Sequence, residues 1–295
     1  MNSHPVLYRL SLFLAACTLI LLVAGSLIAG AGSPLGAAAE ISPWLRIHTA
    51  AGGTMTGVAL VTLIAFFFSD VAKWLKLIGL GCLTALTASA VLGWLPREPV
   101  TGVAHAVVSH ILFAWVVLLS LGASPAWNRE ATPLEDRGWP SLRTLAWLTP
   151  AAVLVQIALG AGYRYGVMSA IPHAMWAFAA ILLVLMLALF TLTSAPAEEH
   201  SGLRGGSLAI MTLVCVQLIL GIVAFLGRMD PPLSFLQAGA LAAVRATHLG
   251  TGALVFGFTV ALSTQVLRCA VPAASASTQS DGDLTASGTG DGRRG

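Results

Sequence analysis

Charged residues are scarce in this chain. Only 9% of its 295 residues are Asp, Glu, Lys or Arg, whereas 57% are hydrophobic. A water-soluble domain carries about a quarter charged residues, so this chain has too few to cover a water-facing surface. The net charge of +3 is too small and too dispersed to indicate nucleic-acid binding. The composition therefore predicts an integral membrane protein whose first partner is the lipid bilayer.

Cysteine is also rare. The four cysteines, Cys17, Cys82, Cys215 and Cys269, fall in apolar segments and show no metal-ligand spacing. We therefore expect them to act as small apolar residues of membrane-spanning segments. No disulfide is expected in an outer loop.

The sequence contains long runs of apolar residues. About 20 such residues are needed to span a hydrocarbon core about 30 Å thick. Eight runs of this length can be read in the sequence, at 7–29, 45–69, 74–95, 102–122, 143–163, 171–193, 207–227 and 240–267. The prediction is an all-α integral membrane protein with eight transmembrane helices. The first run could also be read as a cleavable signal peptide, but its loss would leave seven helices and break the pairing described below.

Basic residues favour one side of the membrane. With eight crossings, ten of the 15 Lys and Arg residues fall on one side and five on the other. Cytoplasmic loops accumulate Lys and Arg, so we expect both termini to be cytoplasmic. The expected location is the plasma membrane, with multiple crossings.

An internal repeat relates the odd-numbered runs. VQIALGAGYRYG at 155–166 and VQLILGIVAFLG at 216–227 share the pattern V-Q-x-x-L-G. Weaker echoes are ASAVLGWLP at 88–96 and LLVAGSLIAG at 21–30. Each odd run thus ends on small residues and is followed by an even run.

A charged loop divides the chain into two halves of four helices each. This loop occupies 123–143, and we assign the halves to 1–130 and 131–270. The remaining residues, 271–295, are mostly Ser, Thr, Gly and Asp, with almost nothing to bury, and are predicted to be a disordered tail.

Histidines mark the even runs. His48, His105, His173 and His248 occur one in each even run, and the odd runs contain none. Under the predicted topology every even run starts outside, so the four lie on one side of the membrane. A single such histidine could be a hydrogen-bonded packing residue. Four at equivalent positions favour a site, because ionisable groups at membrane depth are costly.

The chemistry of imidazole limits which metals or cofactors these histidines could bind. Neutral imidazole binds iron, copper and zinc, but zinc would be expected to bring Cys, Asp or Glu, which the even runs barely offer beside the histidines. Haem needs only one axial imidazole from each side, an apolar cleft and cationic groups for its propionates. Two facing histidines in each half meet the first need. The histidine pattern therefore predicts haem iron as the metal.

Three arginines lie near the same outer ends. Arg46 precedes His48 by two residues, Arg245 precedes His248 by three, and Arg164 closes the fifth run. They are predicted propionate partners, with contact to lipid headgroups as the alternative.

Three further histidines are not predicted ligands. His110 lies five residues after His105, about 140° around a helix, so the two do not face one haem. We expect His110 to support the site or the packing, and His4 and His200 to lie in solvent.

Three segments resemble the haem A synthase and cytochrome oxidase assembly family. They are VAHAVVSHILFAW at 103–115, VQIALGAGYRYGVMSAIPHAMWAFAAILLVL at 155–185, and VRATHLGTGALVFGFTVAL at 244–262. The resemblance covers roughly 5–268. It implies eight helices in two four-helix repeats, with one haem-ligating histidine on each even helix.

The resemblance also implies an activity. Haem A synthases convert haem O to haem A by oxidising a haem methyl group to a formyl group. By position, His48 and His105 would flank the substrate haem, and His173 and His248 would ligate a resident haem b. Haem O synthase and oxidase assembly factors would be the protein partners.

The first half departs from the family pattern. The family has a glutamate three residues before the histidine of the second helix and an arginine directly after it. Here these positions hold Leu45 and Thr49. Leucine cannot accept a proton beside a haem, and Glu40 lies outside the expected helix, so no catalytic residue can be assigned. The first outer loop also lacks the family's cysteine pair and its Asp-Trp-Pro pattern.

Three functions remain open on the sequence. The first is haem A synthase activity. The second is a catalytically inactive b-type haem protein in oxidase assembly or electron transfer. The third is a transporter with protonatable histidines between its repeats.

Overall fold

The computed structural model describes residues 4–30, 43–95, 98–129, 131–136, 139–196, 198–227 and 238–272. Within these residues the chain forms eight long helices and two short strands. The helices are α1 (Pro5–Gly30), α2 (Pro43–Phe68), α3 (Lys73–Trp94), α4 (Pro99–Ala123), α5 (Leu142–Arg164), α6 (Ala170–Ser194), α7 (Ser201–Leu226) and α8 (Ala238–Cys269); the strands are β1 (Leu134–Asp136) and β2 (Ala270–Pro272). All eight helices are long and apolar enough to cross a membrane. The predicted all-α, multi-pass membrane fold is confirmed.

The helix starts follow the positions of proline. Pro43 and Pro99 are the first residues of α2 and α4, where a proline lacks only an N–H group that would have no partner within the helix. The N-cap residue of α4 is Glu98, although the threonine just before the apolar run at 102–122 would suit a cap. Thr101 lies inside α4, and its hydroxyl donates to the carbonyl of Glu98 at 2.8 Å, because the helix begins three residues earlier than the apolar run.

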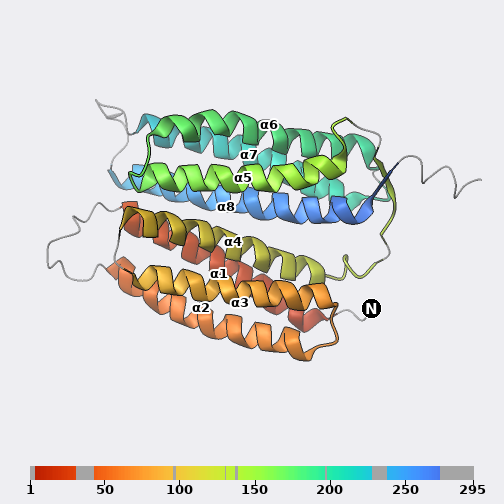
Figure 1. Cartoon of the computed structure of the whole chain (residues 1–295), viewed down its shortest axis with the longest axis horizontal. Helices are drawn as coiled ribbons and strands as arrows, with labels where there is room; N and C mark the ends of the chain where they lie inside the picture. The colour runs from red at the N-terminus through yellow and green to blue at the C-terminus, as the bar shows by residue number, and fades with distance from the viewer. Residues whose placement is uncertain are drawn as a thin grey trace, which may run out of the picture.

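The helices form two halves with the same internal arrangement (Figure 1). In the first half α1 packs against α2 and α4, and α3 packs against α4. In the second half α5 packs against α6 and α8, and α7 packs against α8. The halves meet through α1, α4, α5 and α8. The two predicted four-helix repeats are therefore present in space.

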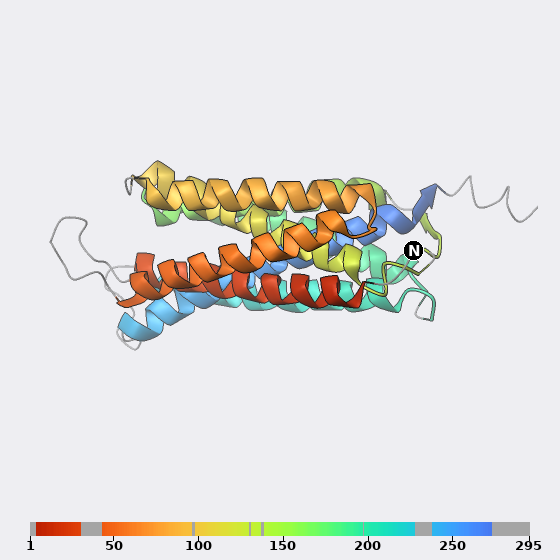
Figure 2. The ribbon, with the colours of Figure 1, turned by 90° about the horizontal axis from the view of Figure 1, so that it is seen from below.

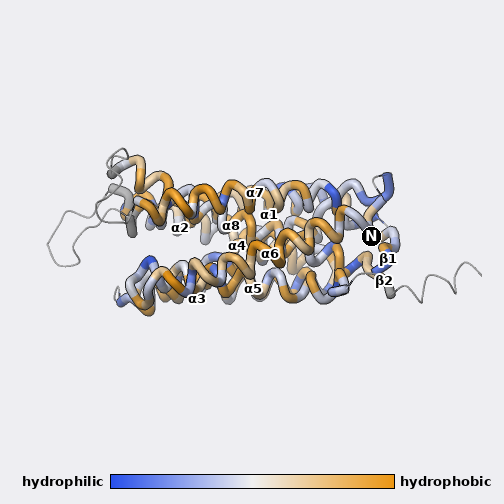
Figure 3. Tube along the Cα trace, turned by 90° about the horizontal axis from the view of Figure 1, so that it is seen from above, coloured by the Kyte–Doolittle hydropathy of each residue, from blue (hydrophilic) through white to orange (hydrophobic). Residues whose placement is uncertain are grey.

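The outer surface of the bundle is apolar along its length. The helices run lengthwise beside one another (Figure 2), and hydrophobic residues dominate the middle of the bundle (Figure 3). Large apolar side chains such as Ile171 and Phe178 are more than two-thirds exposed. Buried hydroxyls, including those of Thr149 and Thr191, donate to carbonyls of their own helices at 2.7 Å. Such a surface suits lipid, and such hydroxyls need no water.

Each half has its own core. One cluster of buried side chains lies among α1 to α4 and includes Leu14, Phe66 and Leu119. The other lies among α5 to α8, joined by the two strands and one residue of α4, and includes Leu187 and Ile210. The two halves are thus separately packed and then joined through α1 and α4 of the first half and α5 and α8 of the second.

The loop between the halves is fastened to the end of α8. Strand β1 pairs in parallel with β2, with Leu134 opposite Ala270. The guanidinium of Arg268 donates to the carbonyls of Trp127 and Arg129 at 2.7 and 2.6 Å, and its carbon lies 4.4 Å from the centre of a Trp127 ring. These contacts hold the connection between the halves at the end where the chain leaves α8.

The predictions for His200 and for the tail at 271–295 both change. His200 is buried, at 5% exposure, and its Nε2 lies 3.2 Å from the carbonyl oxygen of Thr132, so the expectation that it lies in solvent is wrong. The start of the predicted tail, residues 271 and 272, belongs to β2. The remaining tail, 273–295, lies outside the described residues.

Candidate functional site

The four histidines of the even helices lie toward one end of the bundle. Each occurs near the beginning of its helix, and α2, α4, α6 and α8 all begin at the same end, on the left of Figure 1. All four are half-buried, namely His48, His105, His173 and His248. The connections between helices therefore bring together residues that are as far as 200 positions apart in sequence.

Each of these imidazoles packs against a glycine of the preceding helix. The pairs are Gly25 with His48, Gly93 with His105, Gly160 with His173, and Gly221 with His248. In every pair the nearest ring atom is Cε1, and a Cβ added to the glycine would lie between 2.8 and 3.5 Å from it. At Gly160, Gly221 and Gly25 this distance is 3.1 Å or less, so a side chain would press on the ring, whereas the 3.5 Å at Gly93 is an ordinary contact. The structure thus contains one helix-to-helix contact repeated four times.

The glycines explain the sequence repeat. Gly160 and Gly221 are the last residues of the two V-Q-x-x-L-G segments, and Gly25 and Gly93 occupy the same place in the two weaker echoes. The repeat was visible in the sequence, but its glycines were not predicted site residues. Small residues let membrane helices approach closely, and here they admit a ring.

Backbone carbonyls orient two of the rings. Nδ1 of His105 lies 2.9 Å from the carbonyl oxygen of Ser89, and Nδ1 of His173 lies 3.3 Å from that of Gln156. Ser89 and Gln156 both come four residues before the glycine of their pair. A ring that donates from Nδ1 to a carbonyl keeps the lone pair of Nε2 for another partner. Metal-binding histidines are commonly held in this way.

The other two rings differ at Nδ1. Among the described residues, Nδ1 of His48 and Nδ1 of His248 have no partner of hydrogen-bonding geometry, although the backbone of Gln217 lies beside His248. The equivalent of Gln217 in the first helix is Leu21. Instead, the amide nitrogen of Gln217 lies 3.3 Å from Nε2 of His248.

The histidines approach one another in pairs within the halves. His48 interacts electrostatically with His105, and His173 does so with His248. These are the pairs that the sequence predicts, one in each half, and their role as haem ligands stays a prediction. Each joins two even helices, so a ligand held by both imidazoles would lie inside one four-helix half.

The arginines occupy three different environments. Arg46 is exposed, and a separation of two residues places it on the opposite side of α2 from His48. Arg245 is half-buried and lies three residues before His248, on the same side of α8. Arg164 crosses between the halves: it donates through Nη1 to the hydroxyl of Ser26 at 3.1 Å and through Nη2 to the Ser26 carbonyl.

His110 belongs to the packing between helices. It is only 4% exposed, and its Nδ1 lies 2.7 Å from the carbonyl oxygen of Ala106. It interacts electrostatically with Arg164, which comes from the other half. The ring of His105, by contrast, contacts α3.

The positions that depart from the family pattern lie beside His48. Leu45 is half-buried and precedes His48 by three residues, on the same side of α2. The hydroxyl of Thr49 donates to the carbonyl of Leu45 at 2.9 Å. Glu40 lies outside the described residues.

Clusters of conventional metal ligands do not occur in the described part of the chain. No group of three or more His, Cys, Asp or Glu side chains there could hold a metal ion. The arrangement therefore fits a ligand that takes two imidazoles and brings its remaining donors with it.

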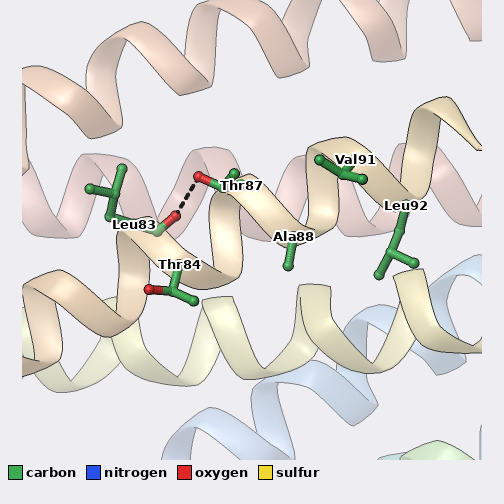
Figure 4. A pocket seen from close by; sticks show the side chains of 6 residues that line it. All are labelled: Leu83, Thr84, Thr87, Ala88, Val91 and Leu92. Carbon is green, nitrogen blue, oxygen red and sulfur yellow. Dashed lines mark hydrogen bonds between the residues drawn. The ribbon is translucent and has the colours of Figure 1, made fainter.

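An open groove runs along α3 (Figure 4). Its lining residues are Leu83, Thr84, Thr87, Ala88, Val91 and Leu92, all from one helix. The two threonine hydroxyls donate within the helix, that of Thr87 to the carbonyl of Leu83 at 2.9 Å and that of Thr84 to the carbonyl of Leu80 at 3.0 Å. With an apolar lining and no free donor among these side chains, the groove suits a lipid chain.

Comparison of the chain with protein-family models gives no match, and comparison with curated proteins gives none either.

Proposed function

We propose that this protein binds haem through two pairs of axial histidines, one pair in each four-helix half. His48 and His105 form the first pair, and His173 and His248 form the second. The observation that supports this most is the fourfold contact between a glycine and an imidazole, which gives four rings the same seat at the same end of the bundle. Packing histidines with unrelated roles would have no reason to share it.

The residues present fit haem better than a bare metal ion. Iron in a porphyrin already has four nitrogen donors, so the protein needs to supply only two. Nδ1 of His105 and of His173 faces a carbonyl, which leaves Nε2 as the coordinating atom. When bound, the iron supplies one-electron redox chemistry.

Arg245 and Arg164 lie where they can serve the second pair. Arg245 shares a side of α8 with His248, and Arg164 follows Gly160 by one helical turn. We propose Arg245 as the propionate partner. Arg164 has the additional task of bonding Ser26, while Arg46 faces away from His48 and suits lipid headgroups.

We further propose that the activity is that of a haem A synthase, the conversion of haem O to haem A during oxidase biogenesis. Its partners would then be haem O synthase and oxidase assembly factors. A b-type haem protein without this activity is the alternative. Leu45 favours the alternative, because no carboxylate stands on the His48 side of α2 at that place.

An optical spectrum of the purified protein tests haem binding. We expect a Soret band with the sharp α and β bands of a low-spin, six-coordinate haem. A preparation from haem-replete cells that shows no Soret band would refute haem binding and leave the transporter, with its histidines as proton carriers, as the better reading.

Pigment analysis separates the two haem functions. The protein is co-expressed with a source of haem O, and the haems are extracted and chromatographed. Haem A or a hydroxylated intermediate would establish the oxidation. Haem b alone, alongside unconverted haem O in the membranes, would establish the alternative.

We propose a plasma-membrane location with both termini in the cytoplasm. The support is the excess of Lys and Arg on that side of the eight helices. A reporter fused to the carboxyl terminus tests it: a fluorescent protein should be bright and alkaline phosphatase inactive, and the reverse pattern would contradict the proposed orientation.

A further inference from the structure

Gln217 and Gln156 occupy the same place in the repeat but contact different groups. Each comes four residues before the glycine that seats a histidine. The amide nitrogen of Gln156 donates to the backbone carbonyl of His173 at 3.1 Å. That of Gln217 lies 3.3 Å from the ring nitrogen Nε2 of His248. Among the described residues, only this one of the four site rings has a side chain hydrogen-bonded to the nitrogen that would coordinate iron.

The contact determines which ring nitrogen of His248 carries the proton. An amide NH2 group is a donor, so Nε2 of His248 must accept and be unprotonated. In a neutral ring the proton is then on Nδ1, which lies beside the backbone of Gln217. This is the tautomer that a histidine needs in order to bind a metal through Nε2.

The amide of Gln217 lies between His248 and Gly252. A Cβ added to Gly252 of α8 would lie 3.1 Å from the Gln217 amide nitrogen, so a side chain there would push against the amide in its position on the ring. The amide oxygen of Gln217 is buried, with no hydrogen-bond partner among the described residues. Moving the amide therefore breaks a single hydrogen bond.

We propose that Gln217 is a positioning residue for His248. In the protein without ligand its amide holds Nε2 unprotonated and keeps the ring on Gly221. When Nε2 binds iron, its lone pair is no longer available, so the amide must give up this hydrogen bond. This inference rests on the proposed haem binding for its second half, whereas its first half concerns the empty protein alone.

Nitrogen NMR of the empty protein tests the first half. The chain has seven histidines, so ¹⁵N-histidine labelling with His248→Gln for assignment isolates one ring. We expect Nε2 of His248 to be unprotonated in the native protein. In Gln217→Leu, which places at this position the residue that the first helix has at Leu21, we expect a mixture of tautomers.

Two variants serve as comparisons. Gln265→Leu removes an amide that donates to its own helix at Ala261 and should leave the His248 signal unchanged. Gln156→Leu should also leave it unchanged, because that amide bonds a backbone oxygen of α6. A protonated Nε2 in the native protein, or a Gln217→Leu spectrum identical to the native one, would overturn the inference whether or not haem is bound.

Uptake of hemin by the empty protein in detergent tests the second half. In Gln217→Leu no amide has to leave Nε2, so the Soret band should grow about fivefold faster than in the native protein, as expected for one hydrogen bond. Gln265→Leu, whose amide bonds its own helix, should not change the rate. An unchanged rate in Gln217→Leu would overturn the release step. Failure of the native protein to take up hemin would instead refute haem binding and leave the NMR result standing.

Discussion

Gly160 of α5 and His173 of α6 are in direct contact, with so little space between them that a methyl group on the glycine would lie 2.8 Å from Cε1 of the ring. A glycine contacts a ring in the other three helix pairs too, closely at Gly25 and Gly221 and at ordinary contact distance at Gly93. It connects a pattern in the odd helices with a pattern in the even helices. The internal repeat of the sequence therefore places, in each odd helix, a glycine that contacts the histidine ring of the next helix.

A methyl group at Gly160 should displace the ring of His173. Overpacking of this kind costs about 1–3 kcal/mol, which corresponds to a loss of haem affinity of about five- to 150-fold for the second pair. We expect Gly160→Ala to shift the g-values of the low-spin ferric haem in electron paramagnetic resonance and to lower the haem content. Gly205→Ala, in open surroundings on α7, is the matched control. Native g-values in Gly160→Ala would contradict the claim that the His173 ring depends on the space at Gly160.

Removal of either ring of the second pair should remove its haem. His173→Ala and His248→Ala each leave one axial nitrogen, so the low-spin spectrum of that haem should disappear. The measurement is the ratio of haem to protein, by pyridine haemochrome and amino-acid analysis. Unchanged ratios in both variants would refute the pairing.

The helices and the four histidines could be predicted from the sequence, for a physical reason. A membrane demands about 20 apolar residues per crossing, and a polar ring within such a run stands out. Every predicted run lies on one of the eight helices, with the largest discrepancy at the start of α7, where residues 201–206 are less apolar but continue the helix. The pairing of His48 with His105 followed from the repeat.

The remaining contacts could not be predicted, because they depend on which faces of the helices meet. Nothing in the sequence shows that Arg164 reaches Ser26 in the other half, or that Gln217 lies against a ring nitrogen. His200 was misassigned for a related reason. It lies in a short polar connection, which usually indicates solvent, but the loop from 131 to 136 covers it.

His110 should matter for stability and not for haem ligation. Its buried ring fills space next to Ala106, and truncation of a large buried side chain to alanine costs about 2–4 kcal/mol. We expect His110→Ala to lower the unfolding temperature in detergent while the haem content and the low-spin spectrum stay native. Loss of haem at a temperature where the variant remains folded would show that His110 is a ligand after all.

The bond between Arg164 and Ser26 should join the two halves. Ser26 is buried, at 3% exposure, and its hydroxyl accepts from the guanidinium across the contact of α1 with the second half. Ser26→Ala removes the hydroxyl but keeps the carbonyl that also accepts from Arg164, so the loss should be about 1 kcal/mol in the free energy of unfolding. Arg164→Gln removes both bonds to Ser26 and should lower the free energy of unfolding by more. Because the hydroxyl of Ser26 bonds Arg164 and not a histidine, Ser26→Ala should keep native haem spectra. Thermal unfolding followed by circular dichroism measures the difference in stability. Equal stability of the native protein and both variants would show that the packing of α1 and α4 against α5 and α8 holds the two halves together without this bond.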